Sequence, residues 1–187
     1  MPPKQRITRE MILERSFEMF CREGMEAVNA RSVAKALNCS TQPIFSYYAG
    51  MDDLKNALEN KAKETFEAAI TNLPEEGDLL VNICKAYVGF AFEQPCLFKY
   101  LFVCSNEGPA YQFMTKEKLE EIAAKEAEST GLELEQTGRA LRHMSVYAHG
   151  YASLLAGGQL SSDMETICAT VDAAHKYILI ALRREEA

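Results

Sequence analysis

Residues 38–55 read NCSTQPIFSYYAGMDDLK, and the side chains at the centre of this run could bind the edges of base pairs. A glutamine can bond adenine N6 and N7 together, Thr and Ser bond several base edges, and Phe or Pro can contact a thymine methyl group. On a helical wheel Tyr48 falls close to Ile44, so these two side chains face a core and the others project. The projecting candidates for base contacts are Thr41, Gln42, Pro43, Phe45 and Ser46, and Tyr47 at the edge of the arc can reach a phosphate oxygen.

An alternative interpretation is that these positions form the ordinary surface of a small helical subdomain. A surface made for solubility alone would be richer in Lys and Glu, which favours the first interpretation. The same geometry nevertheless occurs in proteins that touch no nucleic acid. The helical wheel by itself leaves both interpretations open.

Two helices are expected before this run. The first spans 8–23, with Thr8 as its N-cap and Gly24 as its C-terminal stop. The second is short, spans 30–37, and can be capped by Asn29. Apolar residues recur at spacings of three and four in both segments, which predicts one buried face on each helix.

The candidate residues themselves lie on a third predicted helix, 41–48. Ser40 is its expected N-cap, and Pro43 falls in its first turn, where a missing N–H costs little. Asn38 can end the preceding helix because Asn tolerates a positive φ better than most residues. Two short helices joined by a turn of about three residues make a helix-turn-helix.

The rest of the chain is also predicted to be helical, since no sustained two-residue alternation bounded by hairpin turns occurs. The protein is therefore expected to be all-α, with a three-helix DNA-binding domain over 1–50 and a helical ligand-binding and dimerisation domain over 51–187. The further helices are expected at 52–71, 79–93, 96–103, 111–129, 133–156 and 163–184.

The charge of the chain is unevenly distributed. The 187 residues carry a net charge of −7, which taken whole argues against a nucleic-acid partner. Residues 1–61, however, hold nine Lys and Arg against eight Asp and Glu, whereas residues 62–187 hold eleven against nineteen. The acidic excess is all in the second part, so the first part can still approach phosphates.

Neither the cysteines nor the apolar runs indicate an oxidised, metal-bound or membrane-embedded protein. The six cysteines are scattered without a C-x-x-C pattern, which predicts no disulfide framework and no zinc site. The longest uncharged run, 143–162, contains Gly, Gln, Ser and His, so no membrane partner is expected. A reducing cytoplasm is the expected location.

The ordered spacing of residues 7–58 is specific: ITREMILERSFEMFCREGMEAVNARSVAKALNCSTQPIFSYYAGMDDLKNAL. This segment resembles the N-terminal module of the TetR/AcrR family of bacterial transcriptional regulators. The resemblance implies sequence-specific binding of a double-stranded DNA operator, most simply as a repressor. It covers less than a third of the chain.

The resemblance also assigns roles to residues. It implies that the five base-contact candidates face bases, that Arg31 and Tyr47 hold phosphates, and that Lys4 and Arg6 add backbone contacts. The family usually has Lys where this chain has Met51, so one phosphate contact is expected to be missing. Few contacts per protomer imply a homodimer on a palindromic operator, with half-sites about 34 to 36 Å apart or a multiple of that distance.

The second part of the chain carries more apolar surface than a monomer needs. The last helix is apolar beyond a single stripe, and 144–158 contains no charged side chain. A four-helix interface with two helices from each protomer is the simplest account, and a fully internal helix pair is the alternative.

Aromatic residues, some of them with a polar group at the end of the ring, are frequent between residues 66 and 147. As a set they resemble the wall of a cavity for an apolar or aromatic small-molecule effector. Taken singly, each is more ordinarily a core residue. The candidates for ligand contacts are Phe66, Tyr87, Phe90, Phe102, Tyr111, His143 and Tyr147.

No residue pattern indicates an enzyme active site, a cofactor site or a metal site. The chain has no G-x-S-x-G, no P-loop and no H-E-x-x-H. His143 and His149 fall about 120° out of phase on one predicted helix, so they are not expected to share a metal. The rival hypothesis is a helical enzyme or small-molecule carrier whose N-terminal module does not bind DNA.

Overall fold

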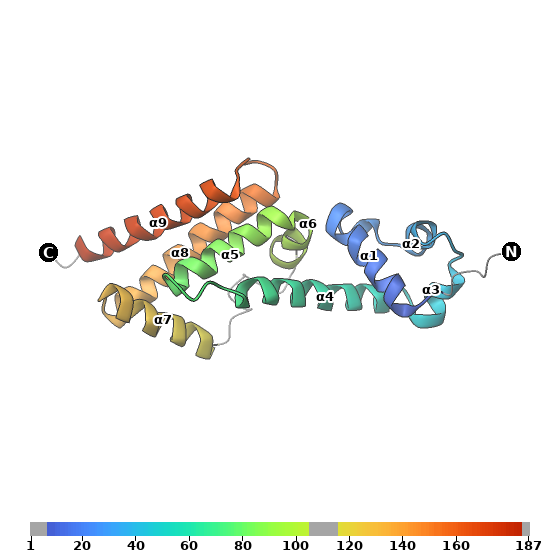
Figure 1. Cartoon of the computed structure of the whole chain (residues 1–187), viewed down its shortest axis with the longest axis horizontal. Helices are drawn as coiled ribbons and strands as arrows, with labels where there is room; N and C mark the ends of the chain where they lie inside the picture. The colour runs from blue at the N-terminus through green and yellow to red at the C-terminus, as the bar shows by residue number, and fades with distance from the viewer. Residues whose placement is uncertain (1–6, 105–115, 185–187) are drawn as a thin grey trace. The chain divides into compact units, whose positions relative to one another are not determined.

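The computed structural model describes residues 7–104 and 116–184, and every regular element in these ranges is helical (Figure 1). The chain divides into two compact units, of which the first ends at Phe66 and the second begins at Glu67. This division falls inside a helix, whereas the sequence analysis placed a domain boundary at residue 50. The expected all-α fold is confirmed.

The first unit is built from three helices, a 3₁₀ turn and the start of a long helix. Its core contains side chains from every α-helix, among them Ile12, Phe20, Val33, Ile44 and Leu54, each almost or wholly inaccessible to solvent. The elements are α1 (Arg9–Glu23), η1 (Met25–Ala27), α2 (Ala30–Ala36), α3 (Gln42–Tyr47) and the first part of α4 (Met51–Thr71).

The predicted caps of α1 and α2 are confirmed. The Thr8 hydroxyl accepts a hydrogen bond from the Met11 amide at 3.2 Å. Gly24 ends α1 with a φ of 87°, and its amide donates to the Phe20 carbonyl at 2.9 Å. Asn29 and Ser32 form a reciprocal capping box at the start of α2. Local side-chain chemistry thus determines where both helices begin.

The turn between α2 and α3 also follows its sequence. Asn38 has a φ of 50°, the positive value expected from its residue type. Its amide donates to the Lys35 carbonyl at 3.1 Å, and the Cys39 amide donates to the Ala34 carbonyl at 3.0 Å. These bonds close the C-terminal end of α2 and turn the chain toward α3.

The predicted cap of α3 is wrong. The helix begins at Gln42 with Thr41 in the N-cap position, and no side-chain hydrogen bond caps it. A cap side chain at Ser40 would accept from the amides of the second or third helical residue, and Pro43 has no N–H to offer. Thr41 has helical dihedral angles, φ −73° and ψ −16°, and its carbonyl accepts the first helical hydrogen bonds, from the amides of Ile44 and Phe45.

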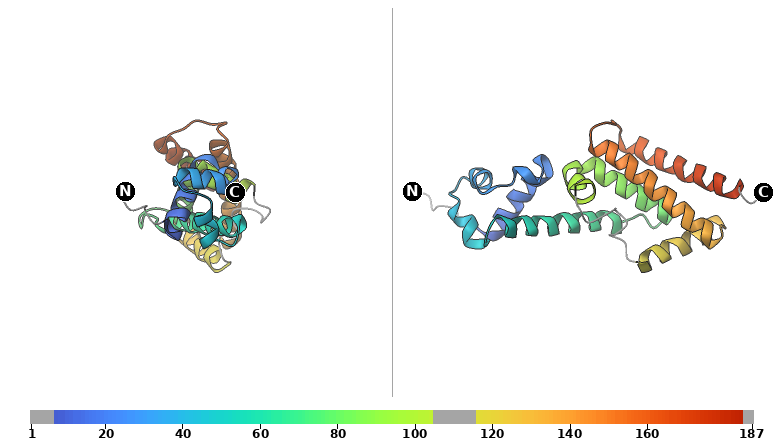
Figure 2. Two further views of the ribbon diagram at one scale, coloured as in Figure 1. Left: turned by 90° about the vertical axis from the view of Figure 1, so that its right-hand side faces the viewer. Right: turned by 180° about the vertical axis from the view of Figure 1, so that it is seen from behind.

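The second unit is a helical bundle. Within it α5 packs against both α8 and α9, and α7 packs against α8. The view from behind shows α5, α8 and α9 side by side (Figure 2, right). Its elements are α5 (Leu79–Glu93), α6 (Pro95–Phe98), η2 (Lys99–Val103), α7 (Lys116–Thr130), α8 (Leu134–Ala156) and α9 (Met164–Arg184). The boundaries that the structure describes agree closely with the prediction, except that the helix expected at 96–103 divides into a short α-helix and a π-helical turn. The start predicted at residue 111 for the helix 111–129 lies outside the described residues.

None of the helices in the described ranges combines the length and the apolar character that a membrane span requires.

Candidate nucleic-acid interface and effector site

The short helix α3 is buried on one side and exposed on the other, as the helical wheel predicts. Ile44 and Tyr48 are 0% and 1% exposed and hold the helix against the core of the first unit. Gln42 and Ser46 are exposed on the opposite side. Thr41 and Pro43 are half-buried.

Two aromatic side chains extend this exposed face. Phe45 is 50% exposed and Tyr47 is 40% exposed, so apolar surface lies beside the polar groups of this helix. Gln42 and Ser46 add hydrogen-bonding groups, and the described part of the face holds no acidic side chain between residues 41 and 47. We call residues 41, 42, 43, 45 and 46 the α3 face. It can offer hydrogen-bond donors, acceptors and apolar contacts together.

Two of the polar groups already take part in internal hydrogen bonds, which sequence patterns did not reveal. The Ser46 hydroxyl donates to the Gln42 carbonyl at 3.0 Å. The Tyr47 hydroxyl donates to the Ile7 carbonyl at 3.2 Å and so ties the segment before α1 to α3. A phosphate contact by Tyr47 would therefore replace a bond that positions the N-terminal segment, because the hydroxyl has one proton to donate and a phosphate oxygen only accepts.

The basic groups near α3 come from two helices. Arg31 is exposed in the first turn of α2, where its amide donates to Asn29 Oδ1 at 3.2 Å. Arg9, in the first turn of α1, places its guanidinium 5.0 Å from the centre of the Tyr48 ring, a cation–π contact. The sequence analysis missed Arg9, because residues 9 and 48 meet only in the folded unit.

The junction between α3 and α4 is fixed by a carboxylate. Asp53 Oδ2 accepts a hydrogen bond from the Ala49 amide at 3.0 Å, and Asp52 also lies in the first turn of α4. Negative charge is favoured at a helix N-terminus. These two carboxylates therefore stabilise the start of α4 at Met51.

In the second unit, three of the predicted effector residues lie in a packed core. The rings of Tyr87 and Phe102 have centroids 5.3 Å apart, and Phe98 joins them at 5.3 and 5.1 Å. Tyr87, Phe90 and Phe102 are all less than a tenth exposed. The contacts are edge-on and tilted, as in an ordinary aromatic cluster.

A hydrogen bond joins this cluster to α8. The Tyr87 hydroxyl lies 2.9 Å from His149 Nδ1. Burial raises the pKa of the Tyr87 hydroxyl, so it remains protonated and is the natural donor. His149 was set aside in the sequence analysis, and only the packing of α5 on α8 brings it to Tyr87.

The other predicted effector residues lie elsewhere. His143 and Tyr147 are exposed on α8, and Tyr147 borders a groove with α9 rather than the aromatic cluster. Phe66 is buried in the first unit, 2% exposed. Tyr111 lies outside the described residues. The assignment of these residues to one effector site therefore stays a prediction.

Two hollows occur in the described part of the second unit. The smaller, about 490 Å³, is a shallow groove along α8 and α9, bordered by Tyr147 and Tyr177 and floored by small side chains of α9. The larger, about 860 Å³, has a mixed lining of aliphatic, acidic and basic side chains. Its lining includes Ile70, Leu73, Asp78, Leu79, Ile83, Lys118, Lys125 and Ser129. Sequence reasoning missed this hollow because it looked for aromatic residues.

Comparison with known proteins places the chain among regulators. A family profile described as "Tetracyclin repressor-like, C-terminal domain" matches residues 80–175, just over half of the chain. No curated protein sequence matches this chain.

Several solved structures share its fold. A TetR-like transcriptional regulator from Rhodococcus sp. RHA1 is 17% identical, with a TM-score of 0.57 over 96% of this chain and 98% of its own. A tetR-family transcriptional regulator from Streptomyces coelicolor is 16% identical, with a TM-score of 0.60 over 95% and 86%. The fatty acid degradation regulator FadR from Bacillus halodurans is 13% identical, with a TM-score of 0.58 over 94% and 97%. At these identities the likeness concerns the fold.

Proposed function

The chain belongs to the TetR-like family of transcriptional regulators, and from this premise we propose that it is a homodimeric repressor that binds a palindromic operator through α3. The observation that carries the proposal is the division of α3 into a buried anchor, Ile44 and Tyr48, and an exposed α3 face. A helix held on one side and polar on the other fits a major groove.

The residue roles follow from position on this surface. Gln42 and Ser46 are proposed to bond base edges, and Phe45 to contact a thymine methyl group. Arg31 and Tyr47 are proposed to hold phosphates. Arg9 is added to the phosphate-binding candidates because it is exposed and its guanidinium is held by the Tyr48 ring at the C-terminal end of α3.

The helices α8 and α9 are proposed to form the dimer interface. Several large apolar side chains on them are exposed: Val146 at 75%, Leu154 at 45%, Met164 at 37%, Tyr177 at 70% and Ile180 at 37%. Isolated exposed apolar residues are ordinary, but several large ones on two helices that pack together fit an interface with a second copy of the same helices. Sedimentation of the wild type and of Tyr177→Glu tests this, because a charge placed in the interface should shift the equilibrium to monomer.

The larger hollow of the second unit is the proposed effector site. Its volume suits a small molecule, and its aliphatic walls favour one that is largely apolar. The charged side chains of its lining are of both signs, and Lys118 and Lys125 are both paired with Glu121. Glu67, Ile70 and Thr71 in the last turns of α4 also line it. Because α4 begins four residues after α3 ends, it is the proposed lever, and a coupling of about 1 to 3 kcal/mol would change operator affinity about 5- to 150-fold.

The family consists of regulators rather than enzymes, and we propose no catalytic activity. Its DNA target would place the protein in the cytoplasm. The rival function is a small-molecule carrier or helical enzyme whose N-terminal unit does not bind DNA.

Selection of binding sites from a random duplex library with the full-length protein separates these functions. We expect a palindromic sequence whose half-sites lie about 10 base pairs apart or a multiple of that spacing. The amount of duplex DNA that the protein retains should fall as the salt concentration rises. Each phosphate that the protein neutralises contributes about −0.9 to the slope of log affinity against log salt concentration. A library without enrichment, and with retention independent of salt, would support the rival function.

A further inference from the structure

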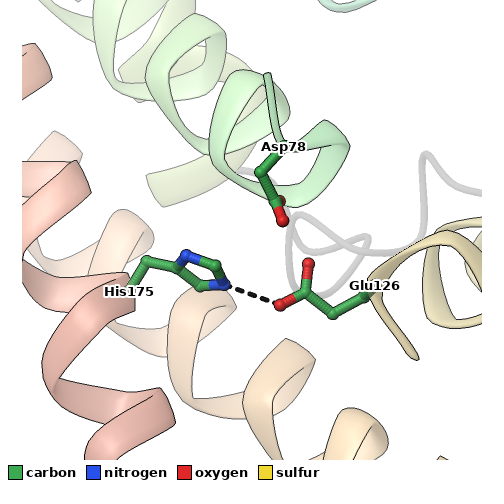
Figure 3. Close-up of side chains that lie close together, drawn as sticks. All are labelled: Asp78, Glu126 and His175. Atoms are coloured by element: carbon green, nitrogen blue, oxygen red, sulfur yellow. Dashed lines mark hydrogen bonds and ion pairs between the residues drawn. The ribbon is translucent and has the colours of Figure 1, made fainter. Parts of the chain in front are cut away.

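Three potential metal ligands from separate parts of the second unit meet in one cluster (Figure 3). Asp78 immediately precedes α5, Glu126 lies on α7, and His175 lies on α9. His175 Nε2 is 2.6 Å from Glu126 Oε1, and one ligand atom from each of the three residues lies within 4.8 Å of the others. No sequence spacing relates these residues, so only the packing of the helices creates the cluster.

One oxygen of the buried carboxylate at the centre of this cluster lacks a hydrogen-bond partner. The Glu126 side chain is 1% exposed and the His175 side chain 10% exposed. Glu126 Oε2 is fully buried and has no hydrogen-bond partner among the described residues. In Figure 3 this oxygen points toward the carboxylate of Asp78. A buried acceptor without a partner is costly, and two carboxylates that face each other repel, so the arrangement needs a cation or a proton between them.

We propose that Asp78, Glu126 and His175 bind a divalent first-row transition metal ion, with Zn²⁺ as the best fit. One imidazole nitrogen and two carboxylate oxygens are ligands that zinc accepts, whereas a set of oxygen ligands alone would favour Mg²⁺ or Ca²⁺. Three protein ligands leave at least one coordination position for water or an effector group.

The distances are compatible with this role after small side-chain movements. Three atoms separated by at most 4.8 Å share a point that is about 2.8 Å or less from each of them, and zinc requires about 2.0 to 2.2 Å. Side-chain rotations that move each ligand atom by less than about an ångström would close this difference. The ion would separate His175 Nε2 from Glu126 Oε1, which are now in direct hydrogen-bond contact.

The surroundings of Asp78 hold its carboxylate in place. Asp78 Oδ1 accepts from the Val81 amide at 3.1 Å and caps α5, while Oδ2 accepts from the Ser129 hydroxyl at 3.3 Å. Hydrogen bonds of this kind orient metal ligands and tune their affinity. Because Asp78 caps α5, the start of this helix fixes its position whether or not an ion is bound.

The cluster has a route to solvent. Asp78 and Ser129 also line the larger hollow of the second unit, so an ion can reach the cluster from this side. A bound ion would link the start of α5 to α7 and α9. An anionic group of an effector bound in the hollow would then be able to coordinate the ion directly.

Titration of the purified full-length protein with Co²⁺ and Zn²⁺ tests the site. We expect one ion per protomer and a visible cobalt spectrum without the near-ultraviolet band of thiolate ligation, because six cysteines could otherwise compete. Asp78→Asn should weaken binding tenfold or more, since Asn retains the helix cap but loses the charge. His175→Gln should weaken it at least as much, and the matched control His143→Gln, at an exposed histidine, should bind as the wild type does.

The result that overturns the proposal is equal affinity of the wild type and Asp78→Asn, or a thiolate band in the cobalt spectrum. Because Asp78→Asn keeps its cap, it decides the question even where His175→Gln fails to fold. Absence of any stoichiometric binding by the wild type also overturns it. The measurement requires no DNA, so it does not depend on the operator-binding proposal.

Discussion

The two units of the protein place their candidate sites in opposite ways. In the first unit the site is a surface, carried by neighbouring residues of one six-residue helix and its N-cap. In the second unit the candidate sites are interior or recessed, and their residues come from helices far apart in the sequence, as Asp78, Glu126 and His175 do. A surface site can be read from local periodicity, whereas an interior site depends on which helices pack together.

The largest expected effect concerns the anchor of α3. Ile44→Ala removes a wholly buried side chain and should cost about 2 to 5 kcal/mol of the free energy of unfolding, with loss of DNA binding. Phe45→Ala, the neighbouring position on the exposed side, should change stability by no more than about 0.5 kcal/mol. Urea denaturation of both variants compares them. Similar losses of stability would show that α3 is not divided into an anchor and a free face.

The next effect separates base contacts from phosphate contacts. Gln42→Ala should cost about 1 to 3 kcal/mol on the selected operator and relax the preference at one base pair. Arg31→Ala should weaken all DNA sequences alike and reduce the salt slope by about 1. Competition titrations on operator and random duplexes measure both quantities. If the two variants lose specificity equally, the assigned roles are wrong.

A smaller effect is expected inside the second unit. Tyr87→Phe removes the hydroxyl that meets His149 Nδ1 at 2.9 Å and keeps the ring in the aromatic cluster. The net loss should be about 0.5 to 1.5 kcal/mol of the free energy of unfolding. Tyr151→Phe, which loses a longer hydroxyl contact of 3.3 Å to Ser162, is the matched control. A larger loss from the control would mean that the Tyr87 hydroxyl contributes no more than an ordinary surface contact.

The smallest effect involves reactivity and leaves stability unchanged. Burial raises the pKa of the Cys84 thiol to about 12, with the nearby Asp78 and Glu126 carboxylates adding to the shift. Cys84 therefore stays protonated and unreactive up to pH values well above neutral, whereas Cys104 is exposed. Iodoacetamide at pH 8 followed by mass spectrometry should label Cys104 and leave Cys84 until the protein is denatured. Early labelling of Cys84 would show that the interior of the second unit opens readily.

Much of the first unit could be predicted from its sequence because its signals are local. Thr8 and Asn29 cap their helices, and Asn38 takes the positive φ, through bonds to residues at most a few positions away. The predicted cap at Ser40 failed for an equally local reason, the missing N–H of Pro43. The contact between Arg9 and Tyr48 was missed because its residues are 39 positions apart.

In the second unit the helix boundaries were predictable but the sites were not. Aromatic content suggested one effector cavity, yet Tyr87 and Phe102 fill a core while His143 and Tyr147 lie on an exposed side of α8. The larger hollow is lined by aliphatic and charged residues, which carry no distinctive sequence pattern. Its position depends on how the end of α4 meets α5 and α7.

The sequence alone determined which segments are helical, where most of them begin and end, and which side of α3 is exposed, because hydrogen bonds within a helix and its caps join residues close along the chain. Only the tertiary structure decided that His149 meets Tyr87 and that His175 meets Glu126 beside Asp78. The physical reason is that each of these meetings depends on the packing of separate helices, which buries and aligns side chains that no local pattern relates.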